Sequence, residues 1–184
     1  SRTNEGWFYE GGGLHRPVTV VTVPAVRIAE HGVYVTSEPK GKLGEDVTAA
    51  ATTVRVSVEL VRSNTDDHHY SVIADVIDPT SPTTVLHSAS EQGAISNETL
   101  HLTMEVPSLK LWWSGKHTDK PALYMLRARL MHANTVLDEV SVTFGVRRAV
   151  FKADSGFWLN GVPLLIDRDQ RDTLDLRSAS VSLR

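Results

Sequence analysis

Few residues of this chain have the types and spacing that chemistry requires. The most concentrated group is Asp66-Asp67-His68-His69, four consecutive side chains that are each able to bind a metal ion. Consecutive residues in a turn point in different directions, so we predict a solvated loop there and no metal site. The eight histidines are scattered and cysteine is absent, which leaves neither a Ser-His-Asp set nor a thiolate site. The sequence therefore predicts no catalytic residue, no metal and no cofactor.

A second candidate is the glycine-rich segment Trp7–Val18, where three aromatic residues and Glu10 precede three consecutive glycines. Such glycines allow positive φ and close backbone approach, which is typical of a crossing between two structural units. They could also cradle a phosphate, but no helix start follows, as such sites require. We therefore expect Glu10 to accept hydrogen bonds from backbone or arginine groups at a domain junction.

The remaining candidates are Trp112-Trp113 and Arg147-Arg148. Adjacent tryptophans could stack on sugar rings, yet neighbouring side chains of an extended segment face opposite sides. We expect Trp112 to pack inside or against a neighbouring domain and Trp113 to cap a loop. A planar guanidinium at Arg147 suits bidentate pairing with a carboxylate across a domain interface. Glu10, Trp112 and Arg147 are thus the predicted domain-interface residues.

These candidates are predicted to lie on a β framework. Period-two alternation marks Thr52–Arg62, Tyr70–Ile77 and Thr99–Val106 as half-buried strands. Further strands are predicted at Thr19–Val23, Val26–Ile28, Gly32–Thr36, Val85–His87, Ala122–Met131 and Val136–Phe144. Ser37–Ala51 is a predicted loop, and no capped helical pattern competes. The sequence predicts an all-β fold, an immunoglobulin-like antiparallel β-sandwich of about seven strands, with a jelly roll or open barrel as the alternative.

Composition excludes several classes of partner. The chain has 184 residues, of which 41% are hydrophobic and 22% charged, as is ordinary for one globular domain with extra arms. Its formal net charge is -3 and its basic residues are dispersed, so we expect no nucleic-acid partner. No apolar run approaches the roughly 18 residues needed to span a bilayer, so we expect no membrane partner. Oligomeric state and localisation do not follow from the sequence.

Four motifs, in order along the chain, resemble those of glycoside hydrolase family 2, the family of β-galactosidase, β-glucuronidase and β-mannosidase. The aromatic and glycine run of Trp7–Val18 is similar to the end of the family's N-terminal sugar-binding sandwich, although His15 and Pro17 depart from the pattern. The other three motifs lie at Leu109–Leu126, Thr143–Arg147 and Phe157–Leu164. In the last, Asn160-Gly161 predicts a hairpin turn with positive φ at both positions.

The resemblance implies a plan of domains. Residues 1–23 would end the preceding sugar-binding sandwich or form a linker, and residues 24–150 would form the immunoglobulin-like sandwich. Residues 151–184 would hold a hairpin leading toward a catalytic barrel, followed by a tail. After Leu165 the tail departs from the family pattern, and the sequence leaves open whether it forms a strand or a disordered end. In the family both catalytic glutamates lie on that barrel, beyond this chain.

The implied function is therefore indirect. The resemblance implies a retaining, β-galactosidase-like parent that hydrolyses O-glycosyl bonds in carbohydrate metabolism. This chain would be its non-catalytic spacer, with the catalytic barrel and the N-terminal sugar-binding domain of the same polypeptide as partners. One alternative is a free-standing carbohydrate-binding or adhesion module. Another is a degenerate enzyme truncated before its barrel. Resemblance of fold does not establish activity.

Overall fold

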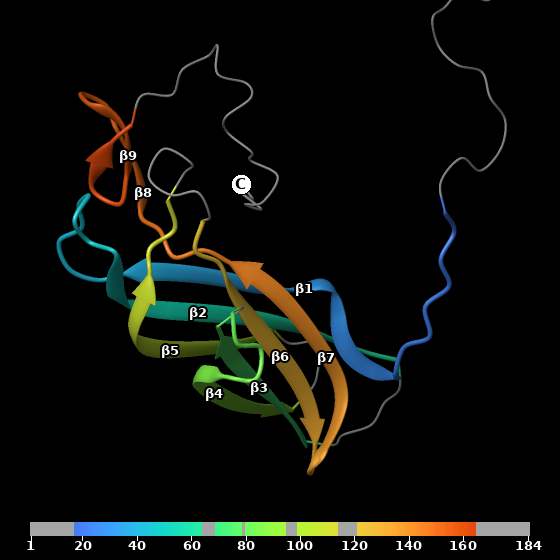
Figure 1. The fold of residues 1–184 in the computed structure, drawn as a ribbon. Coiled ribbons are helices and arrows are strands. Elements are labelled where there is room, and N and C mark those ends of the chain that lie inside the picture. The colour runs from blue at the N-terminus through green and yellow to red at the C-terminus, as the bar shows by residue number, and fades with distance from the viewer. Residues whose placement is uncertain (1–16, 64–68, 79, 95–98, 114–120, 165–184) are drawn as a thin grey trace, which may run out of the picture.

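The computed structural model describes residues 17–63, 69–78, 80–94, 99–113 and 121–164. These residues form ten strands and no helix (Figure 1). No helix long and apolar enough to cross a membrane occurs in this part of the chain. The strands are β1 (Val26–Pro39), β2 (Ala49–Arg62), β3 (His69–Ile77), β4 (Val85–Ala94), β5 (Thr99–Lys110), β6 (Tyr124–His132), β7 (Thr135–Phe144), β8 (Ala149–Lys152), β9 (Gly156–Leu159) and β10 (Val162–Pro163).

Seven of these strands form the predicted antiparallel sandwich. One sheet has the order β1-β2-β5, and the other has the order β4-β3-β6-β7. Strands β8, β9 and β10 make a separate small antiparallel sheet beside one end of the sandwich (Figure 1). The all-β, immunoglobulin-like prediction is confirmed, and the strand count within the sandwich matches it.

The core lies between the two sheets and follows the predicted alternation. On β2, every second side chain from Val54 to Leu60 is buried, and on β3 the same holds from Tyr70 to Val76. On β6, the buried set runs from Tyr124 to Leu130. Because successive side chains of a strand face opposite sides, the intervening residues of β3 and β6 form an outer face. Aliphatic side chains, joined by Tyr70, Trp113, Tyr124 and Phe144, fill a core that in this fold is commonly crosslinked by a disulfide.

Strand β1 differs from its prediction. Two short strands were expected at Val26–Ile28 and Gly32–Thr36, whereas one strand runs through both. Its pairing with β2 shifts register between Ile28 and Val33, and His31 adopts a positive φ of 58° there. A Cβ at Gly32 would lie 2.8 Å from the Cβ of Ala29, so glycine permits this bulge.

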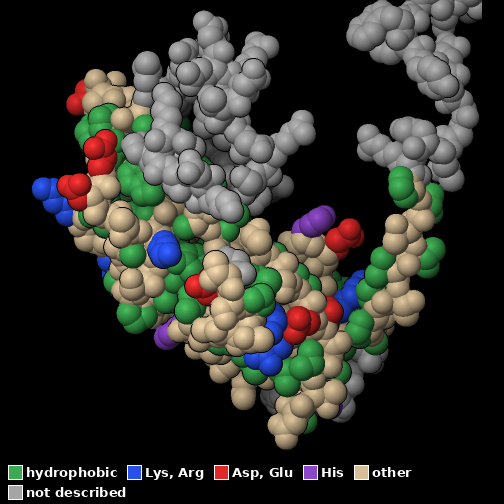
Figure 2. Space-filling model, in the orientation of Figure 1, with side chains coloured by type: hydrophobic (Ala, Val, Ile, Leu, Met, Phe, Trp, Pro, Cys, Tyr) green, Lys and Arg blue, Asp and Glu red, His purple; other side chains and the backbone are tan. Residues whose placement is uncertain are grey.

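The expected strand Thr19–Val23 is wrong. Residues 17–24 have no strand pairing, and their side chains are exposed. Val20 is 91% exposed, and Figure 2 shows hydrophobic side chains along this extended arm, away from the sandwich. The β-branched residues have strand propensity, but no neighbouring strand of the described chain completes a ladder with them.

Other expectations differ in length. The predicted loop Ser37–Ala51 is shorter, because β1 continues to Pro39 and β2 begins at Ala49. The predicted strand Val85–His87 extends to Ala94 as β4, where alternating serine and small residues hid the pattern. The predicted hairpin near Asn160-Gly161 is present between β9 and β10, with φ of 49° and 81° at its two turn residues.

Candidate domain-interface site

Two predicted interface residues meet at the end of the sandwich next to the small sheet. The chain leaves β5 through Leu111 and Trp112, and it leaves β7 through Gly145 and Val146. These exits pair with each other: Leu111 and Val146 form a parallel bridge, and the Trp112 N–H donates to the Val146 carbonyl at 2.7 Å. Each sheet thus contributes one side of the site.

Gly145 allows the Trp112 side chain to pack directly against the backbone. A Cβ built at Gly145 would stand 2.9 Å from Cδ1 of Trp112, closer than real Cβ atoms come to a side chain. The Gly145 carbonyl accepts a hydrogen bond of 3.0 Å from the Ser37 hydroxyl on β1. The Phe-Gly pair of the sequence motif is therefore a packing requirement at this position.

Arg147 covers the Trp112 ring. Its guanidinium carbon lies 4.9 Å from the ring centroid, which is a cation–π contact. Burial lowers the pKa of the Arg147 guanidinium below its usual value. The Trp112 Nε1 is buried and has no hydrogen-bond partner among the described residues. The sequence placed each of these residues at a domain interface without predicting their contact, and the interface role stays a prediction.

The expectation for Trp113 differs from the structure, whereas packing of Trp112 against a neighbouring domain stays a prediction. Trp113 is the more buried, at 8% exposure, and it belongs to the core, whereas Trp112 is only half-buried and packs on the core from the side. The expectation that Trp113 caps a loop is wrong. Alternation along an extended segment predicts that the two rings point in opposite directions. Which ring enters the core depends on the direction the chain takes after β5, and the sequence pattern does not give that direction.

Asn160 ties the small sheet to this site. Its Nδ2 donates to the Trp112 carbonyl at 2.8 Å, and its Oδ1 accepts from the Arg148 N–H at 2.8 Å. Its own N–H donates to the Arg148 carbonyl at 2.7 Å. Asn160 is fully buried. From the sequence it was predicted as a turn residue only, because its two partner residues, Trp112 and Arg148, lie 48 and 12 positions away along the chain.

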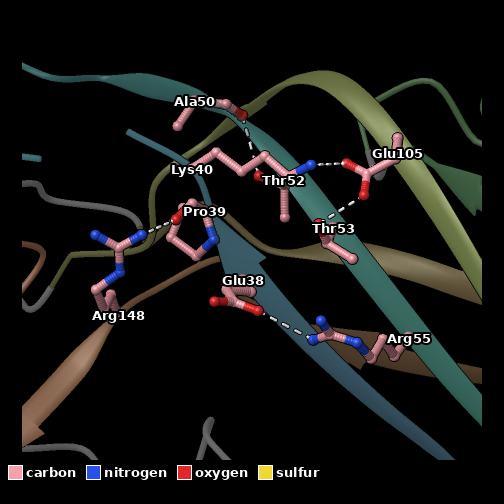
Figure 3. Close-up of polar contacts among 9 residues, drawn as sticks. All are labelled: Glu38, Pro39, Lys40, Ala50, Thr52, Thr53, Arg55, Glu105 and Arg148. Carbon is pink, nitrogen blue, oxygen red and sulfur yellow. Dashed lines mark hydrogen bonds and ion pairs between the residues drawn. The ribbon is translucent and has the colours of Figure 1, made fainter. Parts of the chain in front are cut away.

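Arg148 makes a second connection, to the end of β1. Its guanidinium donates to the carbonyls of Pro39 and Gly41, and Figure 3 shows the side chain aimed at Pro39. Gly161 lies so close to the loop after β1 that a Cβ there would stand 2.5 Å from the Leu43 carbonyl oxygen. The β8–β10 sheet is therefore locked to the sandwich end by backbone and side-chain contacts.

The other predicted candidates do not gather here. Glu10, Asp66, Asp67 and His68 lie outside the described residues. Among the residues that the structure describes, no three histidine or acidic side chains form a group that could hold a metal ion. The buried carboxylate in the described part of the chain is Asp75, and two arginines and a serine occupy its oxygens.

A sugar-stacking platform finds little support in the tryptophans. Trp113 is in the core, and Trp112 is covered by Gly145 on one side and by Arg147 in a cation–π contact. The Trp158 ring carries the Lys152 ammonium 3.6 Å from its centroid. Stacking on a sugar needs a free aromatic face, and a cation occupies one face of the Trp112 ring and one face of the Trp158 ring.

The fold and this site together define the class: an immunoglobulin-like sandwich domain whose sequence motifs pack together at one end of the sandwich. The family described as Glycosyl hydrolases family 2 matches residues 41–147. The chain belongs to this family.

Relatives and solved structures agree with this assignment. A β-glucuronidase of Formosa agariphila is 24% identical over 168 residues, which are 86% of this chain and 16% of the relative. A family 2 structure from Bacteroides cellulosilyticus has a TM-score of 0.65 at 21% identity, covering 77% of this chain and 18% of the other. A Bacteroides fragilis protein classed provisionally as a β-galactosidase has a TM-score of 0.63 at 23% identity, with 77% and 20% covered. The chain thus spans about a fifth or less of these proteins.

Proposed function

We propose that this chain is the non-catalytic spacer domain of a family 2 glycoside hydrolase, set between a sugar-binding domain and a catalytic barrel. The observation that carries the proposal is the position of its two exits. The exposed arm of residues 17–24 leaves the sandwich at one end, and the β8–β10 sheet lies at the other (Figure 1). A domain entered at one end and left at the other separates its neighbours.

The arm supports a neighbour on the N-terminal side. Four of its valines, Val18, Val20, Val21 and Val23, are between 48% and 91% exposed. Burying a valine side chain is worth roughly 1.5 kcal/mol or more, so a run of exposed valines favours pairing with another sheet. The proposed occupant is the preceding sugar-binding sandwich, and residues 1–23 would form its end or its linker.

The site around Arg147 supports a neighbour on the other side. A half-buried guanidinium with a lowered pKa is costly unless a carboxylate completes it, and no ion pair of Arg147 occurs among the described residues. Phe151 of β8, on the small sheet that follows Arg147 along the chain, is 74% exposed. We assign these residues to contact with the barrel that would follow, where the family carries its two glutamates.

The activity of the longer protein would be retaining hydrolysis of a β-glycoside. The curated relatives are β-glucuronidases, one of them from Mus musculus, while one of the structural neighbours is classed provisionally as a β-galactosidase. Those names favour a β-glucuronide over the β-galactoside that the motifs alone suggest. Specificity would reside in barrel loops and not in the residues described here.

The first test is hydrolysis of nitrophenyl β-glycosides, with the glucuronide and the galactoside in the panel. The purified 184-residue chain and the longer product of its gene are assayed side by side. We expect activity in the longer protein alone. Turnover by the 184-residue chain would contradict the proposal and direct attention to Glu10, Asp66 and Asp67. A gene that encodes no barrel after Arg184 would instead favour the truncated, degenerate enzyme.

A further inference from the structure

The outer face of the four-stranded sheet carries a charge cluster that the proposed function does not use. Asp75 on β3 points away from the core, yet its side chain is only 3% exposed. Arg127 and Arg129 of β6 both donate to its Oδ2, at 3.0 and 2.8 Å, and the Ser88 hydroxyl of β4 donates to its Oδ1 at 2.7 Å. Three strands are thus joined through one carboxylate.

The guanidinium groups of Arg127 and Arg129 are fixed by Asp75, but most of their N–H groups have no hydrogen-bond partner among the described residues. The described residues give Arg127 and Arg129 one hydrogen bond apiece, and both Nε atoms are buried without a partner. Along the outer side of β6 the order is Met125, Arg127, Arg129 and Met131, all of them half-buried. Arginine and methionine are enriched in the buried centres of protein interfaces.

The opposite sheet shows how a solvated face of this protein is built. There Lys40 pairs with Glu105 at 2.7 Å and Arg55 pairs with Glu38 at 3.1 Å, one cation to one anion (Figure 3). These side chains are 53–60% exposed, whereas Arg127 and Arg129 are 27–29% exposed. The face around Asp75 is therefore less hydrated and not paired one to one.

Glu139 supplies the missing negative charge on the same face. It lies on β7 directly opposite Arg129, and its exposed carboxylate forms no ion pair with the described residues. Two arginines, Asp75 and Glu139 together are formally neutral. Glu139 would repel a purely acidic partner, whereas the same neutral face on a second copy of the chain would not be repelled.

We propose that this outer face pairs with the same face of a second copy of the chain, in a two-fold dimer. A two-fold axis that runs parallel to the strands, above the space between β6 and β7, places β6 of one copy over β7 of the other. Glu139 of each copy then faces the Arg127–Arg129 pair of the other copy. Sheets pack about 10 Å apart, a gap that an arginine and a glutamate span together. Figure 2 shows basic and acidic side chains gathered side by side on this side of the molecule.

The size of the face sets the strength of the dimer. Four strands spaced about 4.8 Å apart and paired over about seven residues offer on the order of 400 Å² per copy. That area is below the standard size of stable interfaces, so the dimer is weak and forms in the micromolar range or above. Because ion pairs carry much of the contact, added salt weakens it.

Sedimentation velocity of the 184-residue chain over a wide concentration range tests the proposal. Wild type is expected to dimerise reversibly, and Glu139→Arg to weaken the dimer at least about tenfold. Ser141→Arg, an exposed neighbour opposite Arg127, should weaken it similarly by adding like charge. Glu59→Arg, exposed on the outer face of the other sheet, is the matched control and should leave it unchanged.

Two results would overturn the proposal. One is a wild-type chain that stays monomeric at every concentration. The other is a dimer that Glu139→Arg and Ser141→Arg leave intact, since association through another surface, such as the exposed arm of residues 17–24, would behave so. Circular dichroism melting of each variant verifies that it is folded. The side chains of Glu139, Ser141 and Glu59 are all exposed, so each of the three variants is expected to have a melting temperature close to that of wild type.

Discussion

The side chain of Asn160 donates a 2.8 Å hydrogen bond to the main-chain carbonyl of Trp112, 48 residues away. This bond joins the hairpin of the small sheet to the exit of β5, at the place where Arg147 covers the indole. The Phe-x-Leu-Asn-Gly motif and the Leu-Trp motif are therefore two halves of one contact. A motif that reads as a local turn thus also fixes the direction in which the chain leaves the sandwich.

Asn160→Ala is expected to destabilise the chain by about 2–4 kcal/mol. It leaves the Arg148 N–H and the Trp112 carbonyl buried without partners, and it puts an alanine at a φ of 49°. Urea unfolding measures the loss. Asn160→Gly separates the two causes, because glycine accepts that φ, and it should cost about 1 kcal/mol less. Asn134→Ala, in an exposed turn, is the control, and an equal loss there would contradict the assignment.

Gly145→Ala is expected to cost about 1–3 kcal/mol, because its Cβ would overlap Cδ1, Cβ and Cγ of Trp112. Near-ultraviolet circular dichroism should change as well, since the indole must move. Gly44→Ala is the matched control: nothing lies within 4 Å of a Cβ there, and its φ is not positive. Equal unfolding energies for the two variants would show that Gly145 is not a packing requirement.

Much of the fold could be predicted from local pattern alone. Alternation from Val54 to Leu60 and from Tyr70 to Val76 marks two core strands because the period of a strand is two. The wrong strand at Thr19–Val23 has the same local signal, and only the absence of a described neighbour distinguishes it. Strand propensity shows that a segment can adopt an extended conformation, but the segment becomes a strand of a sheet only where another strand lies next to it.

The contacts of the candidate site depend on register between distant strands. Asp75 looks like an ordinary polar residue of a half-buried strand, and Arg127 and Arg129 like ordinary basic ones. Their convergence requires that Asp75 stand opposite Arg127 in the pairing of β3 with β6, across 52 residues of sequence. No spacing within either strand encodes that alignment.

Asp75→Asn is expected to cost about 2–3 kcal/mol at neutral pH, because it leaves two partly buried guanidinium groups facing a neutral amide. Burial alone raises the pKa of this carboxyl, but the hydrogen bond from Ser88 and the pairs with Arg127 and Arg129 outweigh it and lower the pKa below 3.8.

The sign of the pH dependence follows from that lowered pKa. A carboxylate whose pKa is lower in the folded state stabilises the fold above its unfolded pKa, and this contribution is lost as pH falls through the folded value. The stability gap between wild type and Asp75→Asn should therefore be full near pH 6 and shrink below about pH 4. A gap that stays constant down to pH 2 would show that Asp75 does not titrate in this way. Asp46→Asn, at an exposed carboxylate in the turn before β2, tests for a general acid effect.

Removal of residues 1–23 should leave the sandwich intact. The described part of this segment is exposed and unpaired, and β1 begins at Val26. We expect the melting temperature to change by less than ~2 °C. Solubility should rise, because four exposed valines are removed with the segment. A drop of many degrees would mean that the segment belongs to the sandwich, and the boundary at residue 24 would be wrong.

Arg147 distinguishes a packing residue from an interface residue. In the 184-residue chain, Arg147→Met keeps an apolar stem over Trp112 and removes a partly buried cation, so stability should change by no more than about 1 kcal/mol. In the longer protein, the same variant should loosen the docking of the next domain, because a carboxylate there loses its partner. Limited proteolysis between the two domains measures that loosening, and Arg55→Met, on the exposed face of the first sheet, is the control. If Arg147→Met and Arg147→Glu leave both proteins unchanged in melting and in proteolysis, Arg147 does not bind the next domain and its contact with Trp112 is only local packing.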